Sequence, residues 1–108
     1  MAVFQAEYTE AQTKQVIVAG VPDKIIVVTR VAFTSVASAT CTLLSDPNGA
    51  AERIVLAKQH SFSSGFLELV LGRRYGLPAD RGKDLAITTQ ITGPTYLHAV
   101  IIWYELVD

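Results

Sequence analysis

The sequence is poor in cysteine and in charge. One cysteine, Cys41, excludes an internal disulfide, and the absence of a neighbouring thiol or basic residue indicates a small buried hydrophobe. Only 18% of the 108 residues are charged, which is low for a small soluble monomer and predicts surface covered by partners. The formal net charge of -1 gives no bulk attraction to nucleic acid or to an acidic membrane, so we expect neither as a partner.

The sequence also has no N-terminal targeting pattern and no long apolar run. Residues 1–10 lack a basic region followed by an apolar stretch, and no run elsewhere could span a bilayer as a helix. We therefore expect a protein made and used without secretion through a signal peptide. Half of the residues are hydrophobic, which is enough to form the core of one domain covering residues 1–108.

No segment keeps a helical period over three turns, whereas short segments with period-two alternation follow one another along the chain. Turn residues separate nearly all of them, and Asp46-Pro47-Asn48-Gly49 is the strongest turn signal. Residues 1–14 could be an arm on a neighbouring subunit or a first strand, and we favour the strand. The expected strands cover residues 2–9, 15–19, 24–35, 38–45, 53–58, 66–71, 85–92 and 95–107.

These segments predict an all-β fold, an antiparallel two-sheet sandwich with the jelly-roll arrangement of about eight strands. An immunoglobulin-like sandwich is the alternative, but the sequence lacks the Cys–Trp–Cys pattern of that fold. The alternation assigns a set of aliphatic and aromatic residues to the core: Ile25, Val27, Val31, Phe33, Leu43, Leu85, Ile87, Val100 and Ile102.

The segment 95–107 is apolar on both faces, although a half-buried strand should alternate apolar with polar residues. One face carries Tyr96, His98, Val100, Ile102, Tyr104 and Leu106, and the other carries Leu97, Ala99, Ile101, Trp103, Glu105 and Val107. Such a strand lies in the middle of a sandwich, or another subunit covers its second face. We expect a subunit interface at Leu97, Ile101 and Trp103. The residues alone leave open which face packs into the subunit's own core and which face forms the interface.

Catalytic and metal-binding patterns are weak. The segment 59–65, expected to be a polar loop, holds His60 close to several serines, but no nucleophile motif or positioned acid accompanies them. His60 and His98 lie far apart without Asp, Glu or Cys at ligand spacing. We therefore expect no catalytic residue, no metal site, no cofactor and no enzymatic activity.

The longest polar connection, residues 72–84, carries Arg73, Arg74, Tyr75, Arg81 and Lys83. Its basic residues could bind phosphate or a polyanion, but its glycines match neither a P-loop nor a dinucleotide fingerprint. We favour a solvated loop that meets an acidic partner surface. Tyr75 is the best candidate for stacking on a ligand.

Five stretches between residues 24 and 106 together resemble the small jelly-roll virion proteins of tailed bacteriophages, which include capsid decoration (cement) and head-fibre proteins. The stretches are DKIIVVTRVAFTS, ATCTLLSDPNGA, GFLELVL, GLPADRGKDLAITT and VIIWYEL. The resemblance implies a tumour-necrosis-factor-like sandwich that forms a homotrimer on a capsid lattice. It brings no catalytic residues with it.

The resemblance leads us to expect a structural virion protein that is made in the host cytoplasm and lies on the capsid surface, where it binds and stabilises the major capsid protein. Many weak contacts repeated over a lattice would supply stability through avidity. The alternative is a carbohydrate- or receptor-binding sandwich on a phage fibre or tail. An enzyme ranks last, because the residue patterns of a catalytic site are missing.

Overall fold

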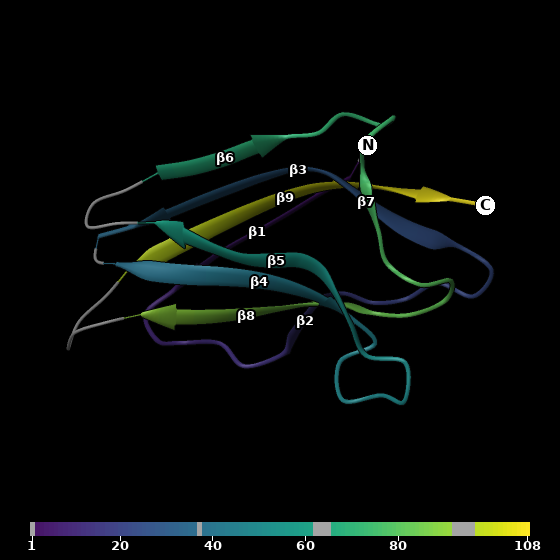
Figure 1. The fold of residues 1–108 in the computed structure, drawn as a ribbon, viewed down its shortest axis with the longest axis horizontal. Helices are drawn as coiled ribbons and strands as arrows, with labels where there is room; N and C mark the ends of the chain where they lie inside the picture. Colours follow the sequence, from purple (N-terminus) through teal and green to yellow (C-terminus); the bar gives the residue numbers. More distant parts are fainter. Residues whose placement is uncertain (1, 37, 62–65, 92–96) are drawn as a thin grey trace.

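The computed structural model describes residues 2–36, 38–61, 66–91 and 97–108 and shows two antiparallel β-sheets packed face to face (Figure 1). The predicted all-β sandwich is therefore confirmed. The strands are β1 (Ala2–Tyr8), β2 (Gln15–Val18), β3 (Ile25–Ser35), β4 (Ala39–Ser45), β5 (Arg53–Ser61), β6 (Phe66–Val70), β7 (Leu77–Pro78), β8 (Leu85–Ile91) and β9 (His98–Val107).

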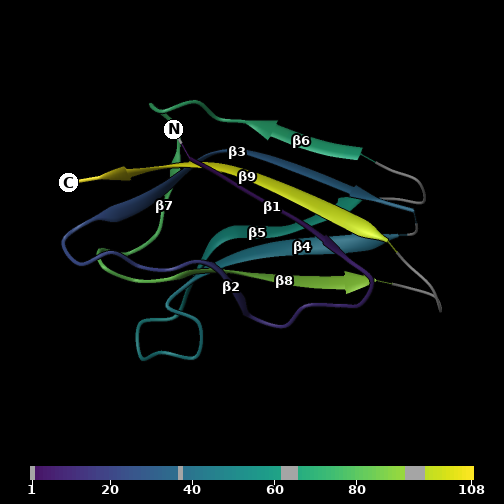
Figure 2. The same ribbon diagram turned by 180° about the vertical axis from the view of Figure 1, so that it is seen from behind.

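The strand order identifies the sandwich as a jelly roll. One sheet has the order β1-β9-β3-β6, with the two-residue β7 also paired to β3, and the other has the order β2-β8-β4-β5. The antiparallel pairs β1–β9, β2–β8, β3–β6 and β4–β5 are nested, so that the chain resembles one long hairpin rolled into two layers. The two terminal strands consequently lie side by side, which Figure 2 shows from behind.

The core lies between the two sheets and consists mainly of aliphatic side chains from β3, β4, β8 and β9. Most of the predicted core is confirmed, because these predicted residues are all fully buried: Val31, Phe33, Leu43, Leu85, Ile87, Val100 and Ile102. Cys41 belongs to the same cluster. Burial raises the pKa of its thiol to about 12, so the thiol stays neutral and behaves as a small hydrophobe.

The predicted positions Ile25 and Val27 are wrong, because β3 contains a β-bulge. Both residues are half-buried, whereas Ile26 and Val28 have exposed fractions of 1% and 0%. The register with β9 runs from Val28 opposite Tyr104 directly to Arg30 opposite Trp103, which leaves Thr29 as an extra residue. Because strand side chains alternate with period two, one inserted residue moves every inward position before it by one.

The bulge also anchors the turn that follows β6. The Leu71 and Gly72 amides donate hydrogen bonds to the Thr29 carbonyl oxygen at 2.9 and 3.1 Å. Gly76 closes this turn against Val27, where an added Cβ would lie 2.4 Å from Val27 Cγ1. A larger side chain at position 76 would therefore displace the turn from the sheet.

Three expected boundaries also differ. Strand β5 extends to Ser61, so that His60 lies in a strand and not in the expected loop, because pairing with β4 continues through Thr40 and His60. The expected connection 72–84 contains β7, which pairs with β3. Strand β9 begins at His98, and the expected positions 92–96, including Tyr96, lie outside the described residues.

We predict that Ile26→Ala destabilises the fold by about 2–5 kcal/mol, the range for emptying a buried Ile site. Ile25→Ala, the matched control on the neighbouring half-buried position, should cost less than half as much. Urea unfolding monitored by circular dichroism measures both changes. A larger loss for Ile25→Ala would contradict the bulge at Thr29.

Candidate interaction face

The main candidate site is the outward side of the β1-β9-β3-β6 sheet, which we call the outer face. Strand β9 lies between β1 and β3, and its residues Val100 and Ile102 are fully buried in the core. Ile101 and Trp103 therefore point outward, where both are half-buried. The register places further residues on this side: Val3, Gln5 and Glu7 on β1, Ala99 and Glu105 on β9, Arg30, Ala32 and Thr34 on β3, and Glu68 and Val70 on β6.

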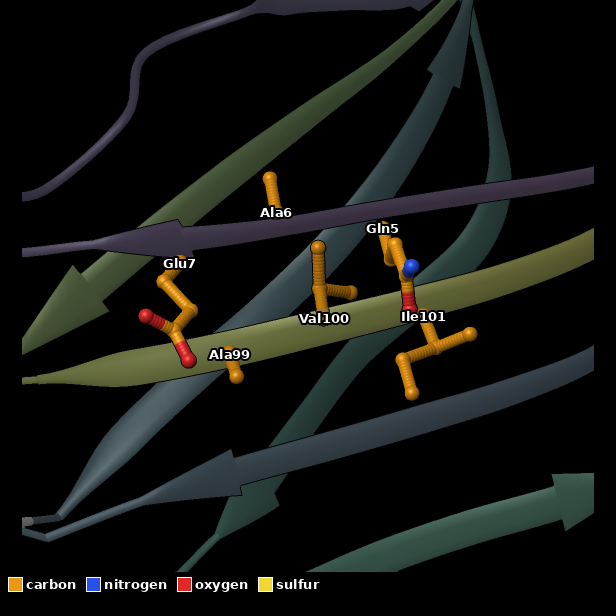
Figure 3. A pocket seen from close by; sticks show the side chains of 6 residues that line it. All are labelled: Gln5, Ala6, Glu7, Ala99, Val100 and Ile101. Atoms are coloured by element: carbon orange, nitrogen blue, oxygen red, sulfur yellow. The ribbon is translucent and has the colours of Figure 1, made fainter.

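The seam between β1 and β9 forms a hollow of about 460 Å³ on this sheet. Its lining includes Ile101 and Ala99 on β9 and Gln5 and Glu7 on β1. Figure 3 shows these four side chains directed away from the Ala6 and Val100 side chains, which point toward the other sheet. Ile101 is half-buried between two small residues, Ala99 on its own strand and the buried Ala32 on β3, so the centre of the outer face is apolar and shallow.

The guanidinium of Arg30 lies above the Trp103 ring, with Cζ 4.3 Å from the ring centroid. Arg30 Nη2 also donates to Glu68 Oε2 at 2.5 Å, so the arginine is held by both an aromatic face and a carboxylate. A smaller hollow of about 260 Å³ lies beside this cluster, lined by Thr29, Arg30, Val70, Gly72 and Trp103. The ion pair is partly exposed and adds little stability by itself, whereas the stacking fixes the orientation of the indole.

Glu105 lies two residues beyond Trp103 and is approached by Arg73 from the turn after β6. Arg73 Nε is 3.1 Å from Glu105 Oε2, although this oxygen is buried and has no hydrogen bond of good geometry within the described residues. The Arg73 side chain is 78% exposed, so the pair is weak. Charges on the outer face are thus largely paired with each other, and this lowers the cost of covering them.

The structure does not bring the predicted basic loop together as one patch. Arg74 lies over the Tyr75 ring at 5.5 Å in the turn beside the outer face, and Tyr75 is 68% exposed. Arg81 instead donates through Nη1 to the Asp23 carbonyl oxygen in the turn between β2 and β3. The backbone amide of Lys83 donates to the Asp80 carbonyl oxygen in a separate turn.

The three predicted interface residues do share one side of the chain. Leu97, just before β9, is 46% exposed and lies an even number of residues before Ile101 and Trp103, as residues on the same face of a strand do. Sequence reasoning missed the contribution of β3 and β6, namely Arg30, Ala32, Glu68 and Val70. Their alignment beside Ile101 and Trp103 depends on strand pairing between distant segments, for which the linear sequence carries no signal.

The outward side of the β2-β8-β4-β5 sheet is different in character. It carries threonines at positions 40, 42 and 88, and one apolar row across the sheet formed by Val16, Ala86, Leu44 and Ile54. Ile54, on the edge strand β5, is 58% exposed. This side has no aromatic residue in its described strands, so the two sides of the sandwich differ chemically.

The described parts of the chain contain no cluster of three or more His, Cys, Asp or Glu side chains arranged to hold a metal ion. In the same residues, no helix has the length and apolar character needed to cross a membrane.

No family model matches the chain, and no curated protein matches it. Among solved structures, it is similar to the globular domain of the zebrafish complement 1qA protein, with 19% identity, a TM-score of 0.50 and coverage of 100% of this chain and 98% of that one. At this identity the similarity concerns the fold alone.

Two further solved structures are similar to a lower degree. The structure of PirA has 10% identity and a TM-score of 0.47, with 94% of each chain covered. The tobacco streak virus coat protein has 12% identity and a TM-score of 0.40, with 89% of this chain and 85% of that one covered.

We predict a measurable coupling between Arg30 and Trp103. A double-mutant cycle with Arg30→Gln and Trp103→Leu should give about 0.5–1 kcal/mol of interaction free energy, as expected for a cation over an indole at a partly exposed site. The matched control is the cycle Arg74→Gln with Tyr75→Leu, whose longer and more exposed contact should give a value near zero. Equal couplings in the two cycles would show that the indole is not held by Arg30.

Proposed function

We propose that this protein is a structural virion protein, a homotrimer that decorates a bacteriophage capsid and stabilises the lattice of the major capsid protein. The observation that carries the proposal is the outer face, an apolar and aromatic sheet surface with an exposed rim. The resemblance of five sequence stretches to phage virion proteins supports the same conclusion. The jelly-roll fold is compatible with it but does not by itself indicate a function.

The outer face has the composition of a protein–protein interface. Its centre is apolar at Ala32, Ala99 and Ile101, and Trp103 is the type of residue that often dominates binding energy. Four of its charged residues form two pairs, Arg30 with Glu68 and Arg73 with Glu105, so covering these pairs does not isolate a charge. A contiguous surface of this kind on a small, weakly charged domain indicates self-association.

A three-fold ring repeats one heterologous contact, in which one part of the surface meets a different part of the next copy. The outer face meets this requirement, because its β1 side and its β6 side differ. The β1 side carries Gln5 and Glu7, and the β6 side carries Val70 beside Arg30. We assign the contact to these two sides, with Ile101 and Trp103 between them.

The turn after β6 is the proposed contact with the capsid. Arg74 and Tyr75 project there together, and Arg73 is anchored to Glu105 at the rim of the outer face. A trimer would present three copies of this turn, so that weak individual contacts with an acidic lattice surface combine by avidity. Arg81 and Lys83 lie in a separate turn, outside this contact.

A carbohydrate- or receptor-binding module is the second candidate, and the exposure of Tyr75 favours it. An exposed aromatic ring flanked by arginine is a suitable platform for a sugar ring. Glycan-array binding by wild-type protein that is lost in Tyr75→Ala would support this candidate. The neighbouring genes provide a further distinction, because a major capsid protein gene favours the decoration role and a glycosidase gene favours the glycan module.

We predict that the wild-type protein is a trimer in analytical ultracentrifugation and that Ile101→Asp is a folded monomer. The substitution places a charge at the centre of the outer face, and it occurs three times in a closed ring. Ile54→Asp is the matched control, because it makes the same change on the exposed outward side of the other sheet and should leave the trimer intact. Ile102→Asp, in the core, should abolish folding.

Trp103 provides a second measurement, because it is the single tryptophan of the chain. Acrylamide quenching of its fluorescence should weaken as wild-type protein is concentrated through the association range, and stay unchanged in Ile101→Asp. A wild-type protein that remains monomeric at high micromolar concentration would refute the trimer. If Ile54→Asp lost the trimer and Ile101→Asp kept it, the subunit interface would lie on the β2-β8-β4-β5 sheet.

A further inference from the structure

His98 is a buried histidine at the end of the sandwich where β9 begins. Its exposed fraction is 1%, and its backbone pairs with Tyr8, the last residue of β1, and with Ser35, the last residue of β3. Its ring lies 5.4 Å from the Tyr8 ring and 6.1 Å, edge to face, from the Phe33 ring. Its Nε2 is 3.1 Å from Thr89 Oγ1 on β8, so one hydrogen bond between side chains joins the two sheets.

The same threonine holds the connection between β1 and β2. Thr89 Oγ1 accepts a hydrogen bond from the Gln12 amide at 2.9 Å, and the Thr89 amide donates to the Gln12 carbonyl oxygen at 2.8 Å. The Lys14 amide donates to Thr88 Oγ1 at 3.0 Å. The contact between His98 and Thr89 is therefore the centre of a small network that links β9, β8 and the segment 9–14, at the end of the molecule where Figure 2 shows β1, β8 and β9 together.

The hydrogen bonds around Thr89 favour a neutral imidazole. When His98 carries its proton on Nδ1, the Thr89 hydroxyl donates to Nε2, and the Thr89 oxygen remains free to accept from Gln12. An imidazolium would donate from Nε2 to Thr89, and the threonine would lose the acceptor for its own proton. Nδ1 has no hydrogen-bond partner within the described residues, so its N–H is unpaired in this tautomer and in the cation alike, and protonation adds a buried positive charge.

We propose that His98 is a pH sensor, whose protonation places an uncompensated charge between the two sheets and opens this end of the sandwich. The elements packed around the ring bring no carboxylate against it in the described residues: Glu10 in the segment 9–14 is exposed, and Lys14 in the same segment pairs with Glu52. Tyr8 on β1 is a neutral phenol whose pKa is raised, mainly by burial, and Cys41 on β4 is a neutral thiol. Strand β8 carries no charged residue, and the nearest charges on β1 and β3, Glu7 and Arg30, lie on the opposite, outward side of the sheet.

Protonation of His98 should destabilise the folded state. The Tyr8 ring could attract a cation, but burial penalises the charged imidazole and lowers the pKa of His98 below its ordinary value of about 6.5. In the unfolded chain the pKa of His98 is about 6.5. Because this pKa is lower in the folded state, the unfolded chain binds more protons as the pH falls below about 6.5. The contribution of neutral His98 to stability is thus complete above about pH 6.5 and is lost as the pH falls toward the folded-state pKa.

His98 is also connected to the outer face through the residue that precedes it. Leu97 precedes His98 directly, and its carbonyl oxygen accepts from the Val36 amide at 3.2 Å. Opening at His98 would therefore displace Leu97, a residue of the proposed subunit interface. This second step rests on the proposed function and makes the trimer less stable in mildly acidic solution.

The test compares wild type, His98→Gln and His60→Gln, since the chain has two histidines. Wild type and His60→Gln should both lose several degrees of Tm between pH 7.5 and 5.5, a range above the ordinary pKa of carboxylates. His98→Gln, which keeps an amide that can bond to Thr89 but cannot titrate, should lose much less. Equal losses of Tm in wild type and His98→Gln would refute the sensor.

An NMR titration of the wild-type imidazole keeps the proposal testable even when His98→Gln fails to fold. The His98 ring should titrate below about pH 6.5, and the protection factors of the Gln12 and Lys14 amides should fall at pH 5.5 relative to that of Val31 in the core. Titration at or above that pH, or unchanged protection of Gln12, would refute the proposal.

Sedimentation at both pH values tests the second step separately. A wild-type trimer that dissociates at pH 5.5, together with a pH-insensitive His98→Gln trimer, supports the coupling. A trimer that is equally stable at both pH values refutes the coupling. A protein that is monomeric at both pH values refutes the proposed function, while the Tm and NMR results still decide whether His98 senses pH.

Discussion

The position of β9 between β1 and β3 determines which side chains of this protein face the core and which face outward. The pairing runs from His98 opposite Tyr8 and Ser35 to Val107 opposite Ile25, so both edges of β9 are occupied. A slip of one residue on either edge would exchange Val100 and Ile102 for Ile101 and Trp103 in the core. Two aliphatic residues fit the narrow space between sheets better than an indole, and their burial fixes the register.

The bulge at Thr29 reconciles two demands on β3. Before it, Ile26 and Val28 must be buried, and after it Val31 and Phe33 must be buried, which a regular strand cannot achieve. The Thr29 hydroxyl donates to the Trp103 carbonyl oxygen at 3.2 Å, and its carbonyl oxygen accepts from the turn after β6. A local irregularity in one strand thereby places Arg30 over Trp103 and positions the turn that carries Arg74 and Tyr75.

His98 is an exception to an otherwise apolar interior. A polar ring in this position costs free energy unless its nitrogens are hydrogen-bonded, and only one of them has a partner in the described residues. A phenylalanine or leucine would fill the same space between Tyr8 and Phe33 without that cost. Residues that break a packing rule at a cost in free energy are candidates for a functional role, and His98 meets that description.

The sequence by itself determined the fold class, most of the strands and most of the core. Alternation with period two is a local property, and it correctly assigned Val31, Phe33, Ile87 and Val100 to the interior. It also indicated that the strand containing Ile101 and Trp103 has two apolar faces. It could not detect the bulge at Thr29, since an inserted residue leaves the composition of a strand unchanged.

Only the tertiary structure decided which face of that strand is outward and which distant residues share it. Arg30 and Glu68 meet beside Trp103 because β3, β6 and β9 pair in one sheet, although these residues lie far apart in the chain. The contact of His98 with Thr89 likewise forms only when the two sheets pack. Pairing between strands is a long-range property of the folded chain, and the candidate site consists almost entirely of such pairings.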